Sequence, residues 1–383
     1  MTSTAAAGRS PMRVMLITTG LKVGGAEHQV VALARAFLAM GNAVAIVSLS
    51  PEREIDVPSG AHVVELNMRK TPAGMMRALW QARGLVRAWR PDVMHAHMIH
   101  ANLFARALTR VTPCPPLVCT AHSFREGGRL RMAAYRLTDR WTDLTTHVSD
   151  EGRLGMIAAG GVPASRIIVM PNGIDTDRFQ PDPMVRQATR AQLGIGTDTR
   201  LLLNVGRLVT EKAQDTLIRA FARIDPAIPA HLLIAGNGAL RHQLSELAAS
   251  LGIASRVTLL GQRNDIPALL NAADTFALSS DVEGLPMVLV EALACGCPVV
   301  STDAPGVVEV VGDLGPIVPR GNVDALTAAL TDALHAGTGT PTAQAGRRAR
   351  VLAAFSIEAV ARRWLALYAS LPGTASVPHA EVA

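Results

Sequence analysis

Residues 13–49 read RVMLITTGLKVGGAEHQVVALARAFLAMGNAVAIVSL. The apolar run from Arg13 to Thr18 predicts a strand, and a Gly-rich turn then leads into a helix predicted over Ala26 to Met40. A second apolar run predicts a strand over Ala43 to Leu49. Strands that lack polar alternation and are joined by a helix are typical of parallel sheets covered on both faces. The stretch therefore predicts an α/β fold.

The same alternation continues along most of the chain and is interrupted once, in a stretch rich in Pro, Asp and Thr. Strands are expected over 63–66, 92–95, 117–121, 201–204, 231–235, 257–260, 275–278 and 298–301, with helices between them and no clear periodicity over 175–199. We expect two doubly wound domains, residues 12–180 and 181–355, then a C-terminal helix over 356–371 that packs back toward the first domain. Residues 1–11 and 372–383 are expected to be flexible tails.

Composition excludes several classes of protein. With 49% hydrophobic and 18% charged residues, the 383-residue chain has enough apolar surface to form packed domains. Four cysteines are too few for a disulfide framework, and no run of about 20 apolar residues could cross a bilayer. Aromatic residues make up 3%, which gives little stacking surface for nucleic acid. The net charge of +6 calls for an anionic partner, and from composition alone a membrane surface, a nucleotide and a nucleic acid all remain open.

A glycine pair follows the first strand. Gly24 and Gly25 open the first helix, where unpaired backbone N–H groups can bind an anion and the backbone can approach a ligand closely. The spacing differs from the dinucleotide fingerprint, and no acidic residue ends the next strand near Ser48, which disfavours an NAD site. A tight turn without a ligand remains an alternative.

Two further clusters carry charges at predicted strand ends. Arg207 and Lys212 follow the first strand of the second domain, where a guanidinium and an ammonium could bind phosphate, although a solvated basic turn is the alternative. Glu283 precedes a helix that starts near Pro286, and Glu291 lies two turns along it among apolar residues. A carboxylate in such surroundings needs a partner.

Together these motifs resemble the retaining glycosyltransferases of group 1, glycosyltransferase family four. That family has the GT-B fold of two facing Rossmann-like domains with an interdomain cleft. The matching segments are Gly24 to Glu27, Thr120 to His122, His147 to Asp150, Met170 to Asp175, Val205 to Leu208 with Lys212, Gly236 to Gly238, Glu283 to Glu291, and Cys295 with Gly296. Two positions depart from the family pattern: Ala213 follows Lys212 where glycine is common, and Asp150 stands where glutamate is frequent, so Asp150 is assigned no role.

The resemblance implies transfer of a hexose-type sugar, with retention, from a UDP- or GDP-linked donor to a glycan or lipid-linked acceptor in cell-surface polysaccharide or glycolipid synthesis. It implies catalytic roles for His122, Arg207, Lys212 and Glu283, with Gly24 and His97 on the acceptor side and no metal cofactor. The donor-binding residues it implies are Gly25, Arg207, Lys212, Asn237, Arg263, Glu283, Gly284, Leu285, Pro286 and Glu291. A non-catalytic nucleotide-sugar-binding subunit, or a Rossmann-type oxidoreductase or epimerase, remains an alternative.

Three motifs could be mistaken for metal sites. Asp175 and Asp177 form a D-x-D that we interpret as turn and capping chemistry. His95, His97 and His100 lack the further ligands of a zinc site and are expected to line the acceptor side. Cys295 and Cys297 lack a second pair and are expected to be small buried thiols.

The positive charge is concentrated in the first domain. Residues 69–140 contain 13 Lys or Arg against three acids, so this stretch carries +10 and the remainder −4. In residues 74–90 arginines are interleaved with Met75, Met76, Trp80 and Trp89. Such a pattern favours an anionic membrane surface as a partner, with the protein cytoplasmic and peripheral at the inner face of the membrane. A solvated arginine-rich helix face is the alternative.

Overall fold

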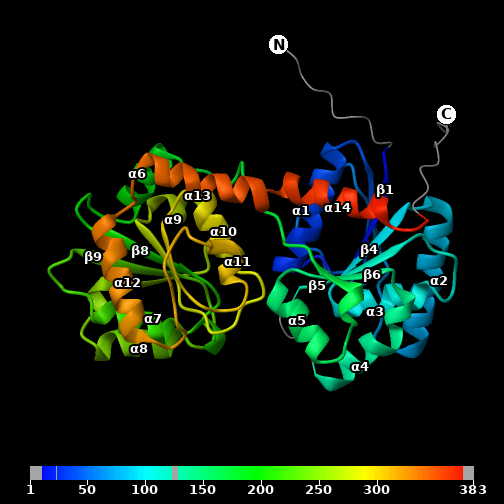
Figure 1. Cartoon of the computed structure of the whole chain (residues 1–383), viewed down its shortest axis with the longest axis horizontal. Helices are drawn as coiled ribbons and strands as arrows, with labels where there is room; N and C mark the ends of the chain where they lie inside the picture. The colour runs from blue at the N-terminus through cyan, green and yellow to red at the C-terminus, as the bar shows by residue number, and fades with distance from the viewer. Residues whose placement is uncertain (1–10, 23, 123–127, 374–383) are drawn as a thin grey trace, which may run out of the picture. The chain divides into compact units, whose positions relative to one another are not determined.

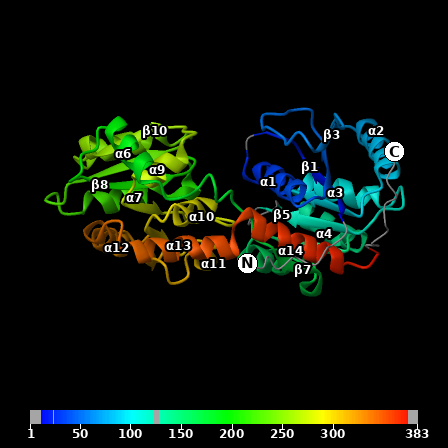
Figure 2. The same cartoon turned by 90° about the horizontal axis from the view of Figure 1, so that it is seen from above.

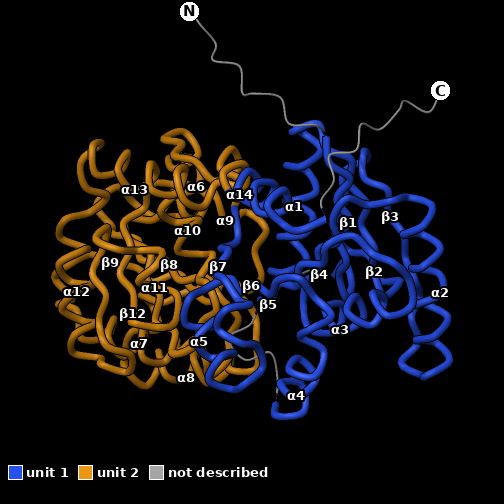
Figure 3. Tube along the Cα trace, turned by 45° about the vertical axis from the view of Figure 1, so that its right-hand side comes forward, with its two compact units in different colours: residues 1–173, 360–383 blue, residues 174–359 orange. Residues whose placement is uncertain are grey.

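The computed structural model describes residues 11–22, 24–122 and 128–373, and Figure 1 shows the order of its helices and strands. The chain forms two compact units (Figure 3). Unit 1 contains the residues up to Gly173 together with those from Val360 onward, and unit 2 runs from Ile174 to Ala359. The expected flexible tails lie almost entirely outside the described residues.

Unit 1 is built on a seven-stranded parallel sheet with the strand order β3-β2-β1-β4-β5-β6-β7. Its strands are β1 (Arg13–Thr18), β2 (Ala43–Ser48), β3 (His62–Glu65), β4 (Val93–His97), β5 (Leu117–Ala121), β6 (Leu144–His147) and β7 (Ile167–Val169). Its helices are α1 (Gly25–Ala39), α2 (Pro72–Trp89), α3 (Ile99–Leu108), α4 (Arg129–Thr138) and α5 (Asp150–Ala158). Helix α14 (Ile357–Ser370) joins this unit from Val360 onward.

Both faces of this sheet are covered, which explains why its strands are apolar throughout. Met15 and Ile17 on one face belong to a buried cluster with residues of α2 and α3. Alternation turns His95 of β4 to the opposite face, where it contacts Tyr368 of α14. Figure 2 shows α14, in red, among the elements of unit 1.

Unit 2 has a six-stranded parallel sheet in the order β10-β9-β8-β11-β12-β13. The strands are β8 (Arg200–Val205), β9 (Ala230–Ala235), β10 (Val257–Gly261), β11 (Thr275–Leu278), β12 (Val299–Thr302) and β13 (Ile317–Val318). The helices are α6 (Pro183–Gln192), α7 (Gln214–Ala222), α8 (Arg241–Ser250), α9 (Ile266–Ala272), α10 (Met287–Ala294), α11 (Val307–Val311), α12 (Val323–Ala336) and α13 (Pro341–Ala354). In Figure 1, α7 and α8 lie on the opposite side of β8 from α6 and α9.

Two helices of unit 2 gave little periodic signal in the sequence. Helix α6 lies inside the stretch 175–199, where none was expected, and it packs through Arg186 and Arg190 rather than through an apolar stripe. Helix α13 likewise uses arginines, since Arg347 and Arg348 donate to backbone carbonyls. An apolar pattern cannot reveal a helix whose inward contacts are made by charged side chains.

The first unit ends seven residues before the boundary at 180 that composition suggested. Ile174 pairs with Ser356 as an isolated parallel bridge, with a hydrogen bond from its N–H to the Phe355 carbonyl at 2.8 Å. Arg348 donates to the carbonyls of Thr176 and Phe179. These bonds attach residues 174–180 to unit 2.

None of the helices in the described segments combines the length and the apolar character that a membrane crossing requires.

A buried carboxylate holds α6 on the sheet of unit 2. Asp274 is 2% exposed and binds Arg186 at 2.5 Å, Arg190 at 3.1 Å and the N–H of Leu201 at 2.7 Å. Three charged or polar donors satisfy its two oxygens, so the ion pairs persist despite burial.

The substitution Asp274→Ala is expected to lower the free energy of unfolding by about 3–5 kcal/mol, because it leaves Arg190 buried and unpaired. Urea unfolding measures the change. Asp324→Ala is the matched control, since the Asp324 side chain is 89% exposed in its pair with Arg223 and should cost less than about 1 kcal/mol. Equal losses for the two variants would contradict the assignment.

Candidate active site

An ion pair between Lys212 and Glu283 lies beyond the carboxyl ends of β8 and β11 in unit 2. Lys212 Nζ donates to Glu283 Oε1 at 2.6 Å, and Ser280 Oγ donates to the same oxygen at 2.6 Å. The two charged side chains are 22% and 9% exposed. Ser279 Oγ donates to the Lys212 carbonyl at 3.0 Å, which fixes the backbone beneath the ammonium. Lys212 and Glu283 were both predicted as site residues from the sequence. Ser280, which binds the same carboxylate oxygen, was not.

Arg207 lies in the turn that follows β8, and its side chain is exposed. Its carbonyl accepts a hydrogen bond from Gln214 Nε2 at 3.0 Å. Within the described segments its guanidinium forms no ion pair with a carboxylate, in contrast to Lys212. Arg207 therefore extends an exposed guanidinium group from a fixed turn. Such a group is available to bind an anion.

The next turn, 236–238, packs directly against this one. Gly236 has a φ of +145°, and a Cβ there would lie 1.9 Å from the Gly206 carbonyl oxygen. The backbone carbonyl of Asn237 accepts a hydrogen bond from the Leu208 N–H at 2.9 Å. Glycine is required here because two backbones approach each other. Asn237 thus lies beside the Arg207 turn at the same edge of the sheet.

Arg263, the next predicted residue along this edge, already has a partner. It follows β10, and its Nε donates to Asp265 Oδ1 at 2.7 Å. The Asp265 carboxylate raises the pKa of Arg263, and Arg263 lowers the pKa of Asp265 through the same hydrogen bonds. Arg263 therefore differs from Arg207 in that a local carboxylate satisfies its charge.

Glu291 lies on α10 among the buried residues Val290, Ala292 and Leu293. Burial raises the pKa of its carboxyl group to about 7, and the nearby Arg178 opposes part of this shift. The described residues supply no ion pair within 4.0 Å for this carboxylate. No described side chain supplies the partner that the sequence led us to expect, and a hydroxyl-bearing ligand would meet the need.

The loop 284–286 ahead of α10 is positioned by Gly306. This glycine has a φ of +75°, and a Cβ on it would lie 2.5 Å from the Gly284 carbonyl oxygen and 3.2 Å from Pro286 Cδ. Leu285 and Pro286 are buried in the same contact. The first turn of α10, whose N–H groups lack intrahelical partners, is thereby held in place.

The remaining predicted residues, Gly24, Gly25, His97 and His122, belong to unit 1. Gly24 caps α1 with extended backbone, and a Cβ on Gly25 would meet nothing within 4 Å. Packing in the structure therefore does not require glycine at position 25. His97 ends β4, His122 follows β5, and His97 Nδ1 lies 3.0 Å from His122 Nε2. Burial lowers the pKa of His122 to about 3, with His147 contributing further.

The Lys212 segment also explains the departure at Ala213. Ala213 has φ 45° and ψ 42°, the left-handed conformation that glycine adopts without strain, and α7 begins at the next residue. The helix entry is therefore preserved with alanine at this position, at the cost of local backbone strain.

The motifs that could be mistaken for metal sites have structural explanations. Asp175 Oδ1 accepts hydrogen bonds from the N–H groups of Asp177 and Arg178 at 3.0 Å each, which confirms the predicted turn chemistry. Cys295 and Cys297 are buried, and burial raises the pKa of the Cys297 thiol to about 12. No group of three His, Cys, Asp or Glu side chains in the described part of the chain is arranged to hold a metal ion.

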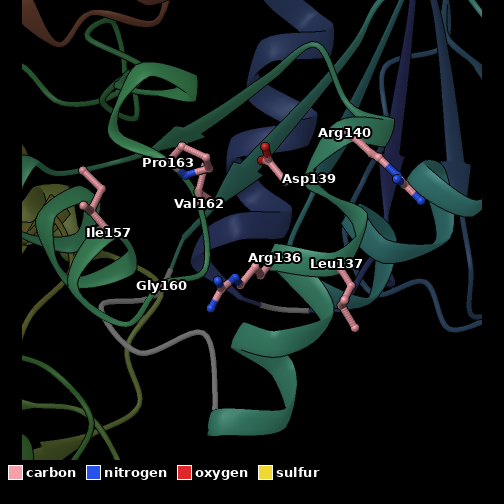
Figure 4. Close-up of a pocket in the computed structure, with 8 residues that line it drawn as sticks. All are labelled: Arg136, Leu137, Asp139, Arg140, Ile157, Gly160, Val162 and Pro163. Atoms are coloured by element: carbon pink, nitrogen blue, oxygen red, sulfur yellow. The ribbon is translucent and has the colours of Figure 1, made fainter.

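A surface pocket of about 670 Å³ in unit 1 involves none of the predicted residues (Figure 4). It lies between the C-terminal end of α4 and the segment that follows α5, and it is lined by Arg136, Leu137, Asp139, Arg140, Ile157, Gly160, Val162 and Pro163. Asp139 pairs with Arg166 at 2.7 Å. We therefore place the candidate site elsewhere, at the strand ends.

Comparison with known proteins agrees with this arrangement. Residues 185–350 match the family model described as glycosyl transferases group 1, and residues 23–178 match the model described as Glycosyltransferase Family 4. The chain belongs to the group 1 glycosyltransferases. Together the two matched ranges contain every predicted site residue.

The chain is similar to two curated relatives over part of their length. It is 35% identical over 233 residues to a GDP-mannose-dependent alpha-(1-6)-phosphatidylinositol monomannoside mannosyltransferase of Mycolicibacterium smegmatis, covering 57% of this chain and 60% of the relative. It is 33% identical over 242 residues to a D-inositol 3-phosphate glycosyltransferase of Mycobacterium bovis, covering 58% and 49%. The chain thus spans about half to three fifths of the length of these relatives.

Solved structures share the fold. A structure of Anabaena HepE in complex with UDP covers 94% of this chain and 100% of its own, with 23% identity and a TM-score of 0.80. A glycosyltransferase from Rickettsia africae covers 94% and 98%, with 18% identity and a TM-score of 0.82. The glycosyltransferase has the GT-B fold, with two Rossmann-like parallel-sheet units, as the sequence predicted.

If Glu291 binds the hydroxyl groups of a nucleotide, as the resemblance implies, the raised pKa of its carboxyl group predicts how that binding depends on pH. A charged carboxylate accepts hydroxyl hydrogen bonds more strongly than a neutral one, so affinity for GDP or UDP should rise several-fold between pH 6 and pH 8. Titration calorimetry at both pH values measures it, and Glu291→Gln, which cannot ionise, corrects for ionisation of the diphosphate. An identical pH dependence in both proteins would contradict a role for the Glu291 carboxylate.

The same shift affects stability in the opposite direction. The folded protein holds the Glu291 proton between the ordinary pKa of 4.5 and about 7, whereas the unfolded chain releases it. The contribution of the Glu291 carboxyl group to the free energy of unfolding is therefore fully present below its ordinary pKa of 4.5, and it is lost as the pH rises through about 7.

Proposed function

We propose that this chain is a retaining glycosyltransferase that moves a hexose-type sugar from a nucleoside diphosphate donor to a glycan or lipid-linked acceptor in cell-surface polysaccharide or glycolipid synthesis. The observation that supports it most is the Lys212–Glu283 pair beside the exposed Arg207 at one edge of the unit 2 sheet. Two cations and a carboxylate at the carboxyl ends of parallel strands suit a ligand that joins a diphosphate to a polyol.

In the proposed reaction, Arg207 and Lys212 stabilise the negative charge that develops on the diphosphate as the sugar bond breaks. Fixed cations act most strongly at such a point because they need no reorganisation during the reaction. These two side chains would supply the positive charge that a metal ion supplies in other transferases, so the proposal includes no metal. Glu291 would accept hydrogen bonds from the ribose hydroxyls.

Glu283 has two tasks in this proposal. It holds the Lys212 ammonium at 2.6 Å, and its carboxylate faces the donor sugar together with the backbone amides from Gly284 onward. Ser280 shares the same carboxylate oxygen, which keeps the side chain in one orientation. His122 contacts the transferred sugar, and the Gly24–Gly25 turn leaves room for the donor and acceptor.

The names of the relatives suggest which donor to test first. The Mycolicibacterium smegmatis relative is described as GDP-mannose-dependent, and HepE has been solved in complex with UDP-glucose. We therefore propose a UDP- or GDP-linked hexose as the donor and rank GDP-mannose first. A lipid-linked acceptor is favoured by the surface of unit 1, where arginines lie among exposed apolar side chains.

The functional test measures sugar transfer and nucleotide binding in the same variants. Glu283→Ala should lower kcat for transfer from GDP-mannose or UDP-glucose by at least about 100-fold, because the sugar loses an oriented carboxylate. Affinity for GDP or UDP should be unchanged or tighter, since Lys212 loses its competing partner. Radiolabelled transfer and calorimetry give the two quantities.

Glu246→Ala is the control, because Glu246 lies on the exposed face of α8, where it pairs with His242. Its turnover should equal that of the wild type. Full turnover in Glu283→Ala would reject the role of Glu283. A wild-type protein that binds the nucleotides but transfers no sugar would support the alternative of a non-catalytic binding subunit.

Unit 1 has a basic surface with exposed apolar side chains. On α2, Met76, Trp80, Arg83 and Arg87 recur at helical spacing, and Met76 and Trp80 are 52% and 59% exposed. The Arg83 guanidinium lies 4.6 Å from the centre of the Trp80 ring. The opposite face of α2 is buried through Ala78, Leu79, Ala82 and Val86. The arginines therefore share their face with apolar side chains that core packing does not use.

Helix α4 has the same character. Leu130 and Leu137 are 88% and 73% exposed, and Arg129, Arg131 and Arg136 are exposed beside them. Exposed leucines interleaved with arginines are the composition of helices that lie at an anionic lipid surface. We propose that this surface docks the protein at the cytoplasmic face of an anionic membrane, where a lipid-linked acceptor would be available.

Co-sedimentation with vesicles of phosphatidylglycerol and phosphatidylcholine measures this docking. The double variant Trp80→Ser with Met76→Ser should bind at least about threefold less, and added salt should weaken binding of the wild type. Met184→Ser is the control, because Met184 is 73% exposed on α6 in unit 2 and should leave binding unchanged. Absence of wild-type binding at low salt would reject the docking proposal.

A further inference from the structure

The loop that leads to Glu283 is held by segments on both of its sides. Residues 279–282 connect the end of β11 to Glu283 and contain no helix or strand. On one side, the N–H groups of Asp281 and Val282 donate to the Glu211 carbonyl at 2.9 and 3.3 Å. This contact joins the loop to the segment that supplies the ammonium of the ion pair.

Strand β12 supplies the contact on the other side of this loop. Thr302, the last residue of β12, is 1% exposed, and its Oγ1 donates to the Ser280 carbonyl at 2.6 Å. In the turn after β13, the Arg320 guanidinium donates to the Asp281 carbonyl at 3.1 Å and pairs with Asp303. Two consecutive carbonyls of the loop therefore accept hydrogen bonds from the β12 and β13 side of the sheet.

Ser280 links the Thr302 contact to the carboxylate. Its carbonyl accepts from Thr302, while its own hydroxyl donates to Glu283 Oε1 at 2.6 Å. Ser280 is 1% exposed, so water does not readily replace either partner. A carbonyl held at position 280 fixes the point from which the Ser280 hydroxyl reaches Glu283. Thr302 thus acts on the carboxylate through one intervening residue.

The hydroxyl of Thr302 serves this contact rather than core packing. Threonine and valine have nearly the same shape, and Val299 and Val300 of the same strand are buried. A hydroxyl is unfavourable in such surroundings unless it forms a hydrogen bond. Valine at position 302 would fill the same space, but it would leave the buried Ser280 carbonyl without this donor.

We propose that Thr302 is a positioning residue that sets the orientation of the Glu283 carboxylate through Ser280. Its effect is selective, because Arg207 and Glu291 lie on other segments and their nucleotide contacts do not depend on this loop. The consequence for sugar transfer rests on the proposed function, whereas the link between Thr302 and the 279–282 loop does not.

Hydrogen exchange measures that link directly. In Thr302→Val the loop loses its contact with β12, so the Asp281 and Val282 amides should exchange at least about tenfold faster than in the wild type. Thr302→Ser retains the hydroxyl and should keep wild-type rates. Exchange followed by mass spectrometry on the full chain needs no donor, acceptor or turnover. Unchanged exchange at both amides in Thr302→Val would overturn the proposal.

Kinetics of the same variants test the consequence for transfer. Thr302→Val should lower kcat for transfer from GDP-mannose or UDP-glucose by about 10- to 100-fold, because small displacements of a group in the site have effects of this size. KM for the donor and Kd for GDP or UDP should change by less than about threefold, since the lost interaction acts on the sugar. Thr302→Ser should restore kcat to within about threefold of the wild type.

Thr142→Val is the matched control. Thr142 is 5% exposed, and its hydroxyl donates to the Leu117 carbonyl at 2.8 Å, at the amino end of β5 in unit 1. This variant loses a buried bond of the same kind away from the carboxyl ends of the strands, so it should lose stability but keep the wild-type kcat. An equal loss of kcat in both valine variants, or no recovery in Thr302→Ser, would overturn the proposal.

Thermal unfolding identifies a variant that fails to fold. If Thr302→Val does so, Thr302→Ala replaces it, and the wild-type exchange rates give a further test. Slow exchange of the Asp281 and Val282 amides is expected in the wild type, and the fast exchange of an unattached loop would overturn the proposal. If the wild-type protein transfers no sugar, the proposed function fails, while hydrogen exchange still confirms or rejects the role of Thr302.

Discussion

The parallel direction of the strands is the constraint on which the candidate site depends. In a parallel sheet every carboxyl end lies at the same edge, so turns far apart in the chain come together there. His97 and His122 follow β4 and β5 in unit 1, and Arg207, Asn237 and Glu283 follow β8, β9 and β11 in unit 2. The cost is that both faces must be covered by helices, which the strands reflect in their apolar composition.

Charged carboxylates around the unit 2 sheet are stabilised by partners rather than by exposure, both at the carboxyl ends of the strands (Glu283) and at the amino end of β11 (Asp274). The Glu283 carboxylate is compensated by an ammonium and a hydroxyl, and Asp274 by two guanidinium groups and an N–H. Glu291 stands apart, since burial raises its pKa and no described cation pairs with it. In unit 2, the Glu283 and Asp274 carboxylates are thus neutralised by partners and stabilise the structure. The Glu291 carboxylate and the Arg207 guanidinium remain available for a ligand.

Much of the fold was predictable because periodicity is a local property. The strands from Arg13, Leu117 and Thr275 and helix α10 were predicted within a residue of their observed starts. Helix α6 was missed because Arg186 and Arg190 replace its apolar stripe. The boundary after Gly173 depends on the bridge between Ile174 and Ser356, which are far apart in the sequence. Neither feature leaves a local signal.

The sequence by itself determined the α/β alternation, the family, and the kinds of residue placed at each strand end. Only the tertiary structure decided their partners. Lys212 meets Glu283 across 71 positions, and His95 meets Tyr368 across 273. Strand order sets these contacts, and strand order follows from packing of the whole unit. Residue type and spacing can therefore predict that a charge needs a partner, but not which side chain supplies it.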